Sequence, residues 1–254
     1  AFHDSAERYP QPQCHPEIRT RMLDVLDRWA VLSSILWLHG PAGSGKSAIA
    51  QSFCQKLRAE GRLGERFFKR GHLSRGNASK LFPTLAYQLA LSVPEFNYPI
   101  SHMVDTDPAI VNRSLHNQLQ NPCRRSGLTH PIVLIIDGLD ECEGYRIQKE
   151  ILRSIANLIH RPLLILFFIA SRPEPHIRES FEEALLSGLR CSLDVQQSFR
   201  DVRKYLLDEF RRIHREHHTM VAPPQPWPPS KIVETLVKNS SGYFICLHCR
   251  QIYR

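Results

Sequence analysis

Residues 40–47 read Gly-Pro-Ala-Gly-Ser-Gly-Lys-Ser and lie between a short apolar run and a stretch with helical periodicity. The run is Ile35–Leu38, and apolar residues recur at three- and four-residue steps from Ile49 to Leu57. This order predicts a buried strand, a tight glycine loop and a helix. A chain of this length matches G-x-x-x-x-G-K-[ST] by chance about one time in a hundred. The feature therefore restricts the chain to folds in which such a loop joins a strand to a helix.

A glycine-rich loop before a helix is suited to binding phosphate. Glycines let successive backbone N–H groups face inward, and the helix directs its positive N-terminal dipole to the same place. Lys46 provides a mobile charge for the β- and γ-phosphates, and the Ser47 hydroxyl is a ligand for Mg²⁺. The residues predicted to bind the nucleotide are Gly40, Pro41, Ala42, Gly43, Ser44, Gly45, Lys46, Ser47 and Ala48.

Further apolar runs indicate the fold class. Residues 131–136 and 163–170 are apolar without polar alternation, and helical patterns over 18–32, 81–89 and 147–159 accompany them. Additional strands are expected around Phe67-Phe68 and over 189–195, whereas 92–130 gives no clear pattern. Continuous apolar strands separated by helices are typical of a parallel sheet covered on both faces. The predicted fold is therefore three-layer α/β with a parallel central sheet.

Polar residues follow two of these runs. Asp137, at the carboxyl end of one, is predicted to hold Mg²⁺ through its water shell. Asp140 and Glu141 come next and are predicted to orient or deprotonate a water molecule. Arg172 ends the other run and is predicted to sense the γ-phosphate, the alternative being a surface arginine before a Pro-terminated turn.

The sequence pattern changes near residue 196, from apolar runs to charged and Pro-rich segments. A long charged helix is expected over 199–217, then a Pro-rich joint, then a helix over 230–238. We predict a lead-in with an amphipathic helix over 1–32, a nucleotide-binding core over 33–195 and a partial helical subdomain over 196–254.

Charge, hydropathy and cysteine content restrict the expected binding partners and the cellular location. The net charge is +8, but acidic residues interleave with the basic ones in 200–215, which is more typical of a solvated helix face than of a nucleic-acid surface. No apolar run approaches the roughly 18 residues of a membrane span. Seven cysteines without a framework and the absence of a signal peptide favour reduced thiols and a cytoplasmic location.

The acidic pattern Asp137-Gly-Leu-Asp-Glu141, together with Ser171-Arg-Pro173, resembles the NACHT family of P-loop signal-transduction NTPases, which belongs to the STAND class. The segments Cys14–Arg19, Ile35–Gly40, Leu81–Leu89 and Ser171–Arg178 are similar to its fungal NLR-like and nephrocystin-3-like branch. The resemblance implies an ATP/ADP switch with Mg²⁺, slow or no hydrolysis, and nucleotide-controlled self-association. It assigns phosphate binding to 40–47, Mg²⁺ to Asp137, hydrolysis to Asp140 and Glu141, and sensing to Arg172.

Two alternatives belong to other classes. One is a nucleotide-independent scaffold that associates with full-length relatives and retains the loop as a relic. The other is an active enzyme such as a nucleotide kinase or helicase, although additional arginine motifs of helicases are missing from the sequence.

The chain starts at Ala1, and we expect it to be part of a longer protein. The tail 246–254 breaks the apolar pattern of a packed helix. Cys246-x-x-Cys249 without a second pair is a weak zinc signal. We interpret the tail as the end of a helix read in a shifted frame.

Overall fold

The computed structural model describes residues 13–15, 18–32, 34–68, 81–112, 128–142, 144–159, 164–183, 186, 188–216 and 227–244. The strands are β1 (Ile35–His39), β2 (Leu63–Phe68), β3 (Ile132–Asp137), β4 (Ile165–Ser171) and β5 (Arg190–Asp194). The main helices of the sheet domain are α1 (Thr20–Leu32), α2 (Lys46–Ala59), α3 (Leu81–Ser92), α4 (Pro94–Thr106), α6 (Tyr145–Ile159) and α7 (Pro175–Glu182). Two 3₁₀ helices, η4 (Pro108–Asn112) and η5 (Leu139–Glu141), and the C-terminal helices α9 (Phe199–Glu216) and α10 (Ser230–Asn239) complete the described elements.

The five strands form one sheet in the order β2-β3-β4-β1-β5, and each pairing is parallel. In a parallel sheet all the carboxyl ends meet at one edge. The register sets His39 opposite Ser171, and Asp137 opposite Ala170. The loops after β1, β3 and β4 therefore leave the sheet side by side, which brings together segments more than a hundred residues apart.

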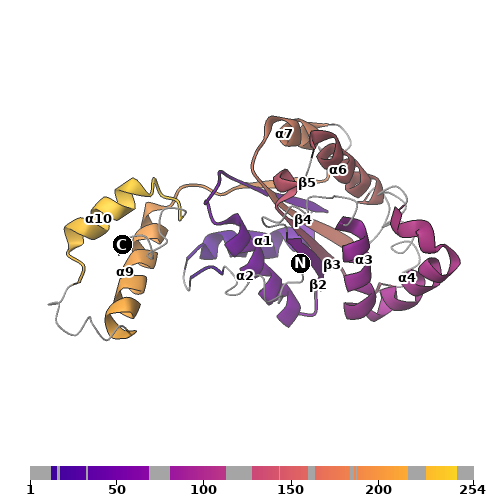
Figure 1. Cartoon of the computed structure of the whole chain (residues 1–254), viewed down its shortest axis with the longest axis horizontal. Helices are drawn as coiled ribbons and strands as arrows, with labels where there is room; N and C mark the ends of the chain where they lie inside the picture. Colours follow the sequence, from indigo (N-terminus) through magenta and orange to yellow (C-terminus); the bar gives the residue numbers. More distant parts are fainter. Residues whose placement is uncertain are drawn as a thin grey trace.

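Helices cover both faces of the sheet (Figure 1). Leu36 and Leu38 of β1 pack with residues of α1 and α2, whereas Ile35 and Trp37 pack with residues of α3, α6 and α7. This alternation explains the continuous apolar strands, because each residue faces one helical layer or the other. The predicted three-layer α/β fold with a parallel central sheet is confirmed.

Helices α9 and α10 form a separate pair beside the sheet domain (Figure 1). They pack through a small cluster of buried residues, Val202, Leu206, Phe210, Val233 and Val237. Ser198 caps α9, since its hydroxyl accepts the backbone N–H of Asp201 at 3.2 Å. The charged residues of α9 are paired along its exposed face, as in Arg212 with Glu209 at 2.8 Å.

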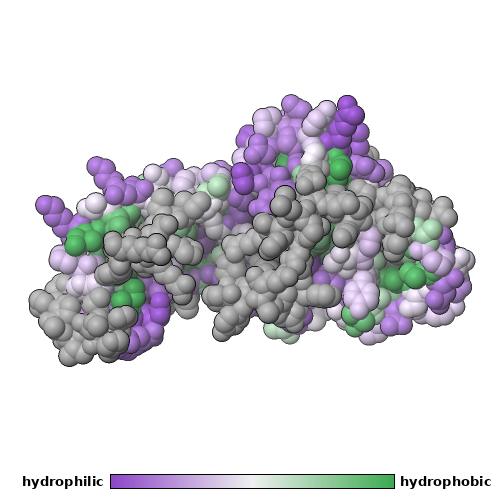
Figure 2. All heavy atoms as spheres, in the orientation of Figure 1, coloured by the Kyte–Doolittle hydropathy of each residue, from purple (hydrophilic) through white to green (hydrophobic). Residues whose placement is uncertain are grey.

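The helical and strand predictions hold with shifted ends, and the unassigned stretch contains structure. Helix α4 and the 3₁₀ helix η4 lie within 92–130, where Pro and Asn obscured the periodicity. Pro94 occupies the first turn of α4, where a missing N–H costs nothing. Figure 2 shows hydrophobic surface over α10 and over α3–α4. The exposed large hydrophobic residues of these helices include Ile232 of α10, Leu91 of α3 and Val104 of α4.

Across these ranges no helix is long and apolar enough to span a membrane. The tail 246–254, with its predicted frame shift and Cys246-x-x-Cys249, lies outside the described residues, and so does most of the Pro-rich joint. Cys14, Cys54, Cys142 and Cys191 are not in disulfide bonds.

Candidate functional site

The glycine loop follows β1 and ends at the first turn of α2. Gly43 and Gly45 have φ angles of 73° and 95°, in the left-handed region that other residues avoid. A Cβ at Gly40 would lie 3.0 Å from the Ser44 hydroxyl oxygen and 3.1 Å from the Val195 Cβ. The loop is therefore packed tightly against the residue after β5, and it requires glycine for two physical reasons, conformation and space.

Lys46, the first residue of α2, folds back over this loop. Its Nζ donates hydrogen bonds to the carbonyl oxygens of Gly40 at 2.8 Å and Pro41 at 2.9 Å. Burial lowers the pKa of Lys46, while the charges of Asp140 and Asp137 act in the opposite direction. The ammonium group is thus held at the mouth of the loop in a field of carboxylates. An anion placed there would favour its charged form.

Asp137 is the last residue of β3, and only 5% of its surface is exposed. The chain then turns through Gly138, which has a φ of 86° and donates its N–H to the Ala170 carbonyl at 2.9 Å. This bond fastens the acidic turn to β4. Glu141 ends η5 and is exposed.

Asp140 is bound to the end of β4 by both carboxylate oxygens. One oxygen accepts the backbone N–H of Arg172 at 2.9 Å, and the other lies 3.1 Å from the Arg172 Nε. The Asp140 side chain is 6% exposed, whereas that of Arg172 is 49% exposed. The structure therefore places Arg172 on Asp140, with half of its side chain facing solvent.

A supporting network that the sequence did not suggest lies behind this turn. The Gln148 amide nitrogen donates to the backbone carbonyls of Asp140 at 3.2 Å and Cys142 at 2.6 Å, and its amide oxygen contacts the His176 ring. Gln148 lies on α6 and His176 on α7, so both covering helices hold the acidic turn. A buried glutamine in an amphipathic helix is the available sequence signal, and it is too common to be diagnostic.

The predicted site residues meet at the carboxyl edge of the sheet. Lys46 follows β1, Asp137, Asp140 and Glu141 follow β3, and Arg172 follows β4. Ser47 is half-buried in the first turn of α2, beside Lys46. Where these residues meet, the site combines a cation, several carboxylates and a loop of backbone N–H groups.

These residues fit a nucleotide with Mg²⁺. The left-handed glycines and the half-buried Lys46 are the features that a phosphate group requires. Within the described ranges, no three His, Cys, Asp or Glu side chains are grouped to hold a metal ion. Mg²⁺ needs no such cage, because it keeps several waters and uses one or two protein ligands plus phosphate oxygens. The Ser47 hydroxyl and the Asp137 carboxylate are the oxygen ligands at this site that would suit Mg²⁺.

The loop also contacts residues near both ends of the chain, and no local sequence pattern predicts these contacts. The backbone N–H of Phe244 donates to the Gly43 carbonyl at 3.1 Å, and the Arg19 guanidinium donates to the Ser44 carbonyl at 3.3 Å. In the sequence, Arg19 is the last residue of a segment that resembles the fungal branch, and nothing there assigns a role to its side chain. A charged residue directly before an apolar helix gives no sign that its side chain is buried.

Comparison with known proteins identifies one matching family and several solved structures with a similar fold. Residues 23–172 match the family described as nephrocystin 3, N-terminal. No curated protein sequence matches the chain.

Two solved structures share the fold. The Walker-type ATPase of Pyrococcus abyssi is 16% identical with a TM-score of 0.53, and 80% of this chain covers 61% of that chain. A DNA replication initiation factor is 11% identical with a TM-score of 0.52, at 92% and 61% coverage. The chain thus spans 61% of the length of each. At these identities the likeness shows the three-layer α/β fold alone.

Proposed function

Because the chain belongs to the nephrocystin 3 N-terminal family, we propose that it is a nucleotide-binding switch module of the NACHT type that takes ATP or ADP with Mg²⁺. The observation that carries this proposal is the position of Lys46, which is bonded to two loop carbonyls and surrounded by the charges of Asp137, Asp140 and Glu141. In this proposal residues 40–48 hold the phosphates, and Ser47 and Asp137 hold Mg²⁺. Bound Mg²⁺ would neutralise charge that develops on the phosphate oxygens.

Slow hydrolysis is the second part of the proposal. Asp140 already accepts two contacts from Arg172, so neither carboxylate oxygen is disposed to take a proton from water. Glu141 is the exposed acid of the turn and is the better candidate for orienting a water molecule. We assign Arg172 the role of a γ-phosphate sensor, because its exposed side chain can exchange the carboxylate of Asp140 for a phosphate oxygen.

We further propose a division into a lead-in (1–32), a nucleotide-binding core (33–195) and a helical subdomain (196–254). It is supported by the separation between the sheet and the α9–α10 pair. Self-association in a longer cytoplasmic protein, of the kind found in the fungal NLR-like branch, belongs to the same proposal.

Titration with a fluorescent ADP analogue in the presence of Mg²⁺ tests nucleotide binding. We expect saturable binding by the wild type, weakened at least about tenfold in Lys46→Ala, since that variant loses the charge at the loop mouth. The matched control is Lys56→Ala on the same helix, whose ammonium group pairs with Asp27 on the surface. No binding by a folded wild type contradicts the proposal and favours a nucleotide-independent scaffold. Equal binding by the wild type and Lys46→Ala contradicts the assignment of the phosphates to this loop.

Hydrolysis is measured separately as phosphate release from ATP. We expect slow release by the wild type and a further loss in Glu141→Gln, with ADP affinity preserved. Rapid turnover would contradict the switch and favour an active P-loop enzyme.

A further inference from the structure

Arg19 has an unusual backbone for a buried arginine. It directly precedes α1, its φ angle is 59°, and it is 9% exposed. The left-handed conformation costs a non-glycine residue about 1–2 kcal/mol. Such a conformation persists where the surrounding contacts determine it. The contacts of the Arg19 side chain therefore determine this backbone conformation.

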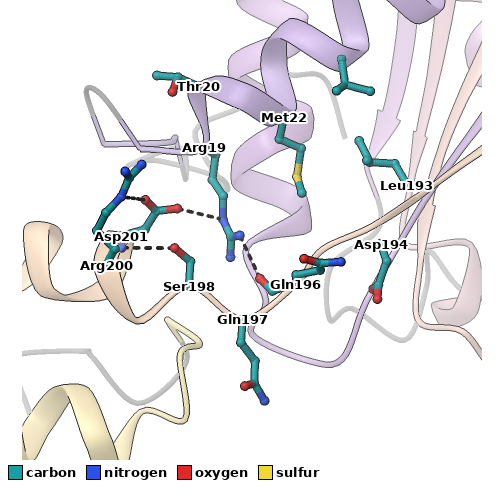
Figure 3. Close-up of a pocket in the computed structure, with 11 residues that line it drawn as sticks. Arg19, Thr20, Met22, Leu193, Asp194, Gln196, Gln197, Ser198, Arg200 and Asp201 are labelled. Carbon is teal, nitrogen blue, oxygen red and sulfur yellow. Dashed lines mark hydrogen bonds and ion pairs between the residues drawn. The ribbon is translucent and has the colours of Figure 1, made fainter.

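The guanidinium group of Arg19 joins four parts of the molecule, and Figure 3 shows two of these contacts, those with Gln196 and Asp201. It donates to the Ser44 carbonyl in the glycine loop at 3.3 Å and to the Gln196 carbonyl after β5 at 2.9 Å. Its Nε lies 3.8 Å from the carboxylate of Asp201 on α9. Its central carbon lies 5.7 Å from the ring centroid of Phe244, in the turn after α10. One side chain thus contacts both the phosphate-binding loop and the helix pair.

The charge of Arg19 depends on this setting. Burial lowers its pKa, and the Asp201 carboxylate counters that effect. A buried cation that loses its carboxylate partner is left uncompensated, so Arg19 and Asp201 stabilise each other only when α9 is docked. Arg19 also forms part of the wall of a pocket of about 460 Å³ between α1, the end of β5 and the start of α9.

Backbone contacts reinforce the same junction. Ser198 donates its N–H to the Gly242 carbonyl at 3.1 Å, and Phe244 donates to Gly43 at 3.1 Å. Near them, His15 lies 3.7 Å from Asp208 and packs its ring edge-on against Tyr205. The α9–α10 pair is therefore fastened to the sheet domain at the glycine loop and the lead-in.

Arg19 controls the direction of one peptide group in the loop. The carbonyl of Ser44 and the N–H of Gly45 share a trans peptide plane, so they point in opposite directions. When Arg19 holds the carbonyl on its own side, the Gly45 N–H is turned away from Arg19. A phosphate-binding loop works only when such N–H groups are fixed toward the anion before it arrives.

We propose that Arg19 is a positioning residue that couples the glycine loop to α9, so that nucleotide binding and docking of the α9–α10 pair form one linked equilibrium. The inference rests on the proposed nucleotide binding and adds its regulation. Coupling of this kind is reciprocal: if docking raises nucleotide affinity, nucleotide must favour docking by the same factor.

The test uses the whole chain and two measurements, affinity for the fluorescent ADP analogue with Mg²⁺ and amide hydrogen exchange in 199–216 with and without ADP. We expect Arg19→Met to lose at least about tenfold in affinity and to abolish the ADP-dependent protection of α9. The ADP affinity of Arg19→Lys should lie between those of the wild type and Arg19→Met. A lysine keeps the charge near Asp201 but cannot donate to two carbonyls at once as the planar guanidinium does. A purely structural role would lower stability without removing the response of α9 to ADP.

Arg203→Met is the control, since Arg203 lies on α9, the helix of Asp201, and pairs with Glu234 of α10 at 2.6 Å on the exposed surface. We expect it to keep both the affinity and the protection. Asp201→Asn removes the carboxylate that pairs with Arg19, so we expect the same losses of ADP affinity and of α9 protection as in Arg19→Met. If Arg19→Met does not fold, Asp201→Asn and Arg19→Lys together test the coupling.

The outcomes separate the two proposals. If the wild type binds ADP and Arg19→Met binds it within about twofold with α9 still protected, the coupling is wrong and the proposed function stands. If the folded wild type does not bind ADP, both are overturned.

Discussion

The sheet domain and the α9–α10 pair are stabilised in different ways. The sheet buries apolar side chains on both faces, and every residue of β3 is buried. The helix pair has a cluster of five buried residues and an outer face of ion pairs. Since buried apolar area is the main stabilising term and exposed ion pairs contribute little, the two regions should differ sharply in stability. The sheet domain thus holds the loop on a large core, and the helix pair docked beside it has a small core of its own.

The largest effect should come from Phe168→Ala in β4. Phe168 is completely buried and packs against Phe53 of α2 at 5.7 Å between ring centroids. Truncation should lower the free energy of unfolding of the sheet domain by about 3–5 kcal/mol, measured by urea denaturation. Phe199→Ala, whose ring is 45% exposed, is the control and should change little. A similar loss in both variants would show that burial does not distinguish these positions.

A smaller and local effect is expected for Phe210→Ala in α9. Phe210 is 2% exposed and meets the Trp227 ring edge-on at 5.5 Å. Its loss should cost about 3 kcal/mol within the helix pair. Amide exchange should accelerate in 199–216 and 230–239, while the sheet strands keep their protection. Simultaneous loss of protection in the strands would break the comparison, because the two regions would then unfold as one unit.

Gly242→Ala tests the junction between the regions. Gly242 has a φ of 75°, and a Cβ there would lie 2.9 Å from the Gln197 Cβ and 3.1 Å from the Ser198 nitrogen. Gly61→Ala is the matched control, since its φ is 67° but a Cβ there would meet nothing within 4 Å. Both changes carry a conformational cost of about 1–2 kcal/mol. Only Gly242→Ala should also undock the helix pair, seen as faster exchange in α9. Equal exchange in the two variants would contradict the close approach.

The smallest effect concerns pH and His39, which ends β1 beside the loop. Burial lowers the pKa of His39 from its ordinary 6.5, and Asp194, 3.5 Å away, opposes that shift. The unfolded chain then binds the proton more readily, so the His39 contribution to stability is present above pH 6.5 and decreases as the pH falls below it.

His39→Gln isolates this contribution from those of the other histidines. Urea denaturation should give the variant a flatter dependence of unfolding free energy on pH between about 7 and 5.5. If acidification instead increased the unfolding free energy of the wild type relative to the variant, the pKa of His39 would be raised by folding. That result would contradict the burial of a neutral His39 ring.

Much of the fold was predictable from local patterns. The apolar runs that became β1, β3 and β4 had no polar alternation, and that alone required helices on both faces. Helix α4 was not predicted, because prolines in a sequence usually indicate a loop. Pro94 in fact occupies the first turn of α4, and Pro99 lies inside the helix. The strand ends shifted by a few residues, since ends depend on hydrogen bonds to neighbouring strands that no local pattern records.

The sequence by itself determined the glycine loop, Lys46 and the order of acids after a buried strand, because these are local features with fixed spacing. Only the tertiary structure decided that Arg172 binds Asp140, that Gln148 and His176 brace the acidic turn, and that Arg19 links the loop to α9. Those contacts join residues that are distant in the chain, such as Asp140 and Arg172, 32 positions apart, and Arg19 and Asp201, 182 positions apart. The physical reason is that a side chain's partners across the sheet edge depend on strand order and helix docking, which sequence spacing does not encode.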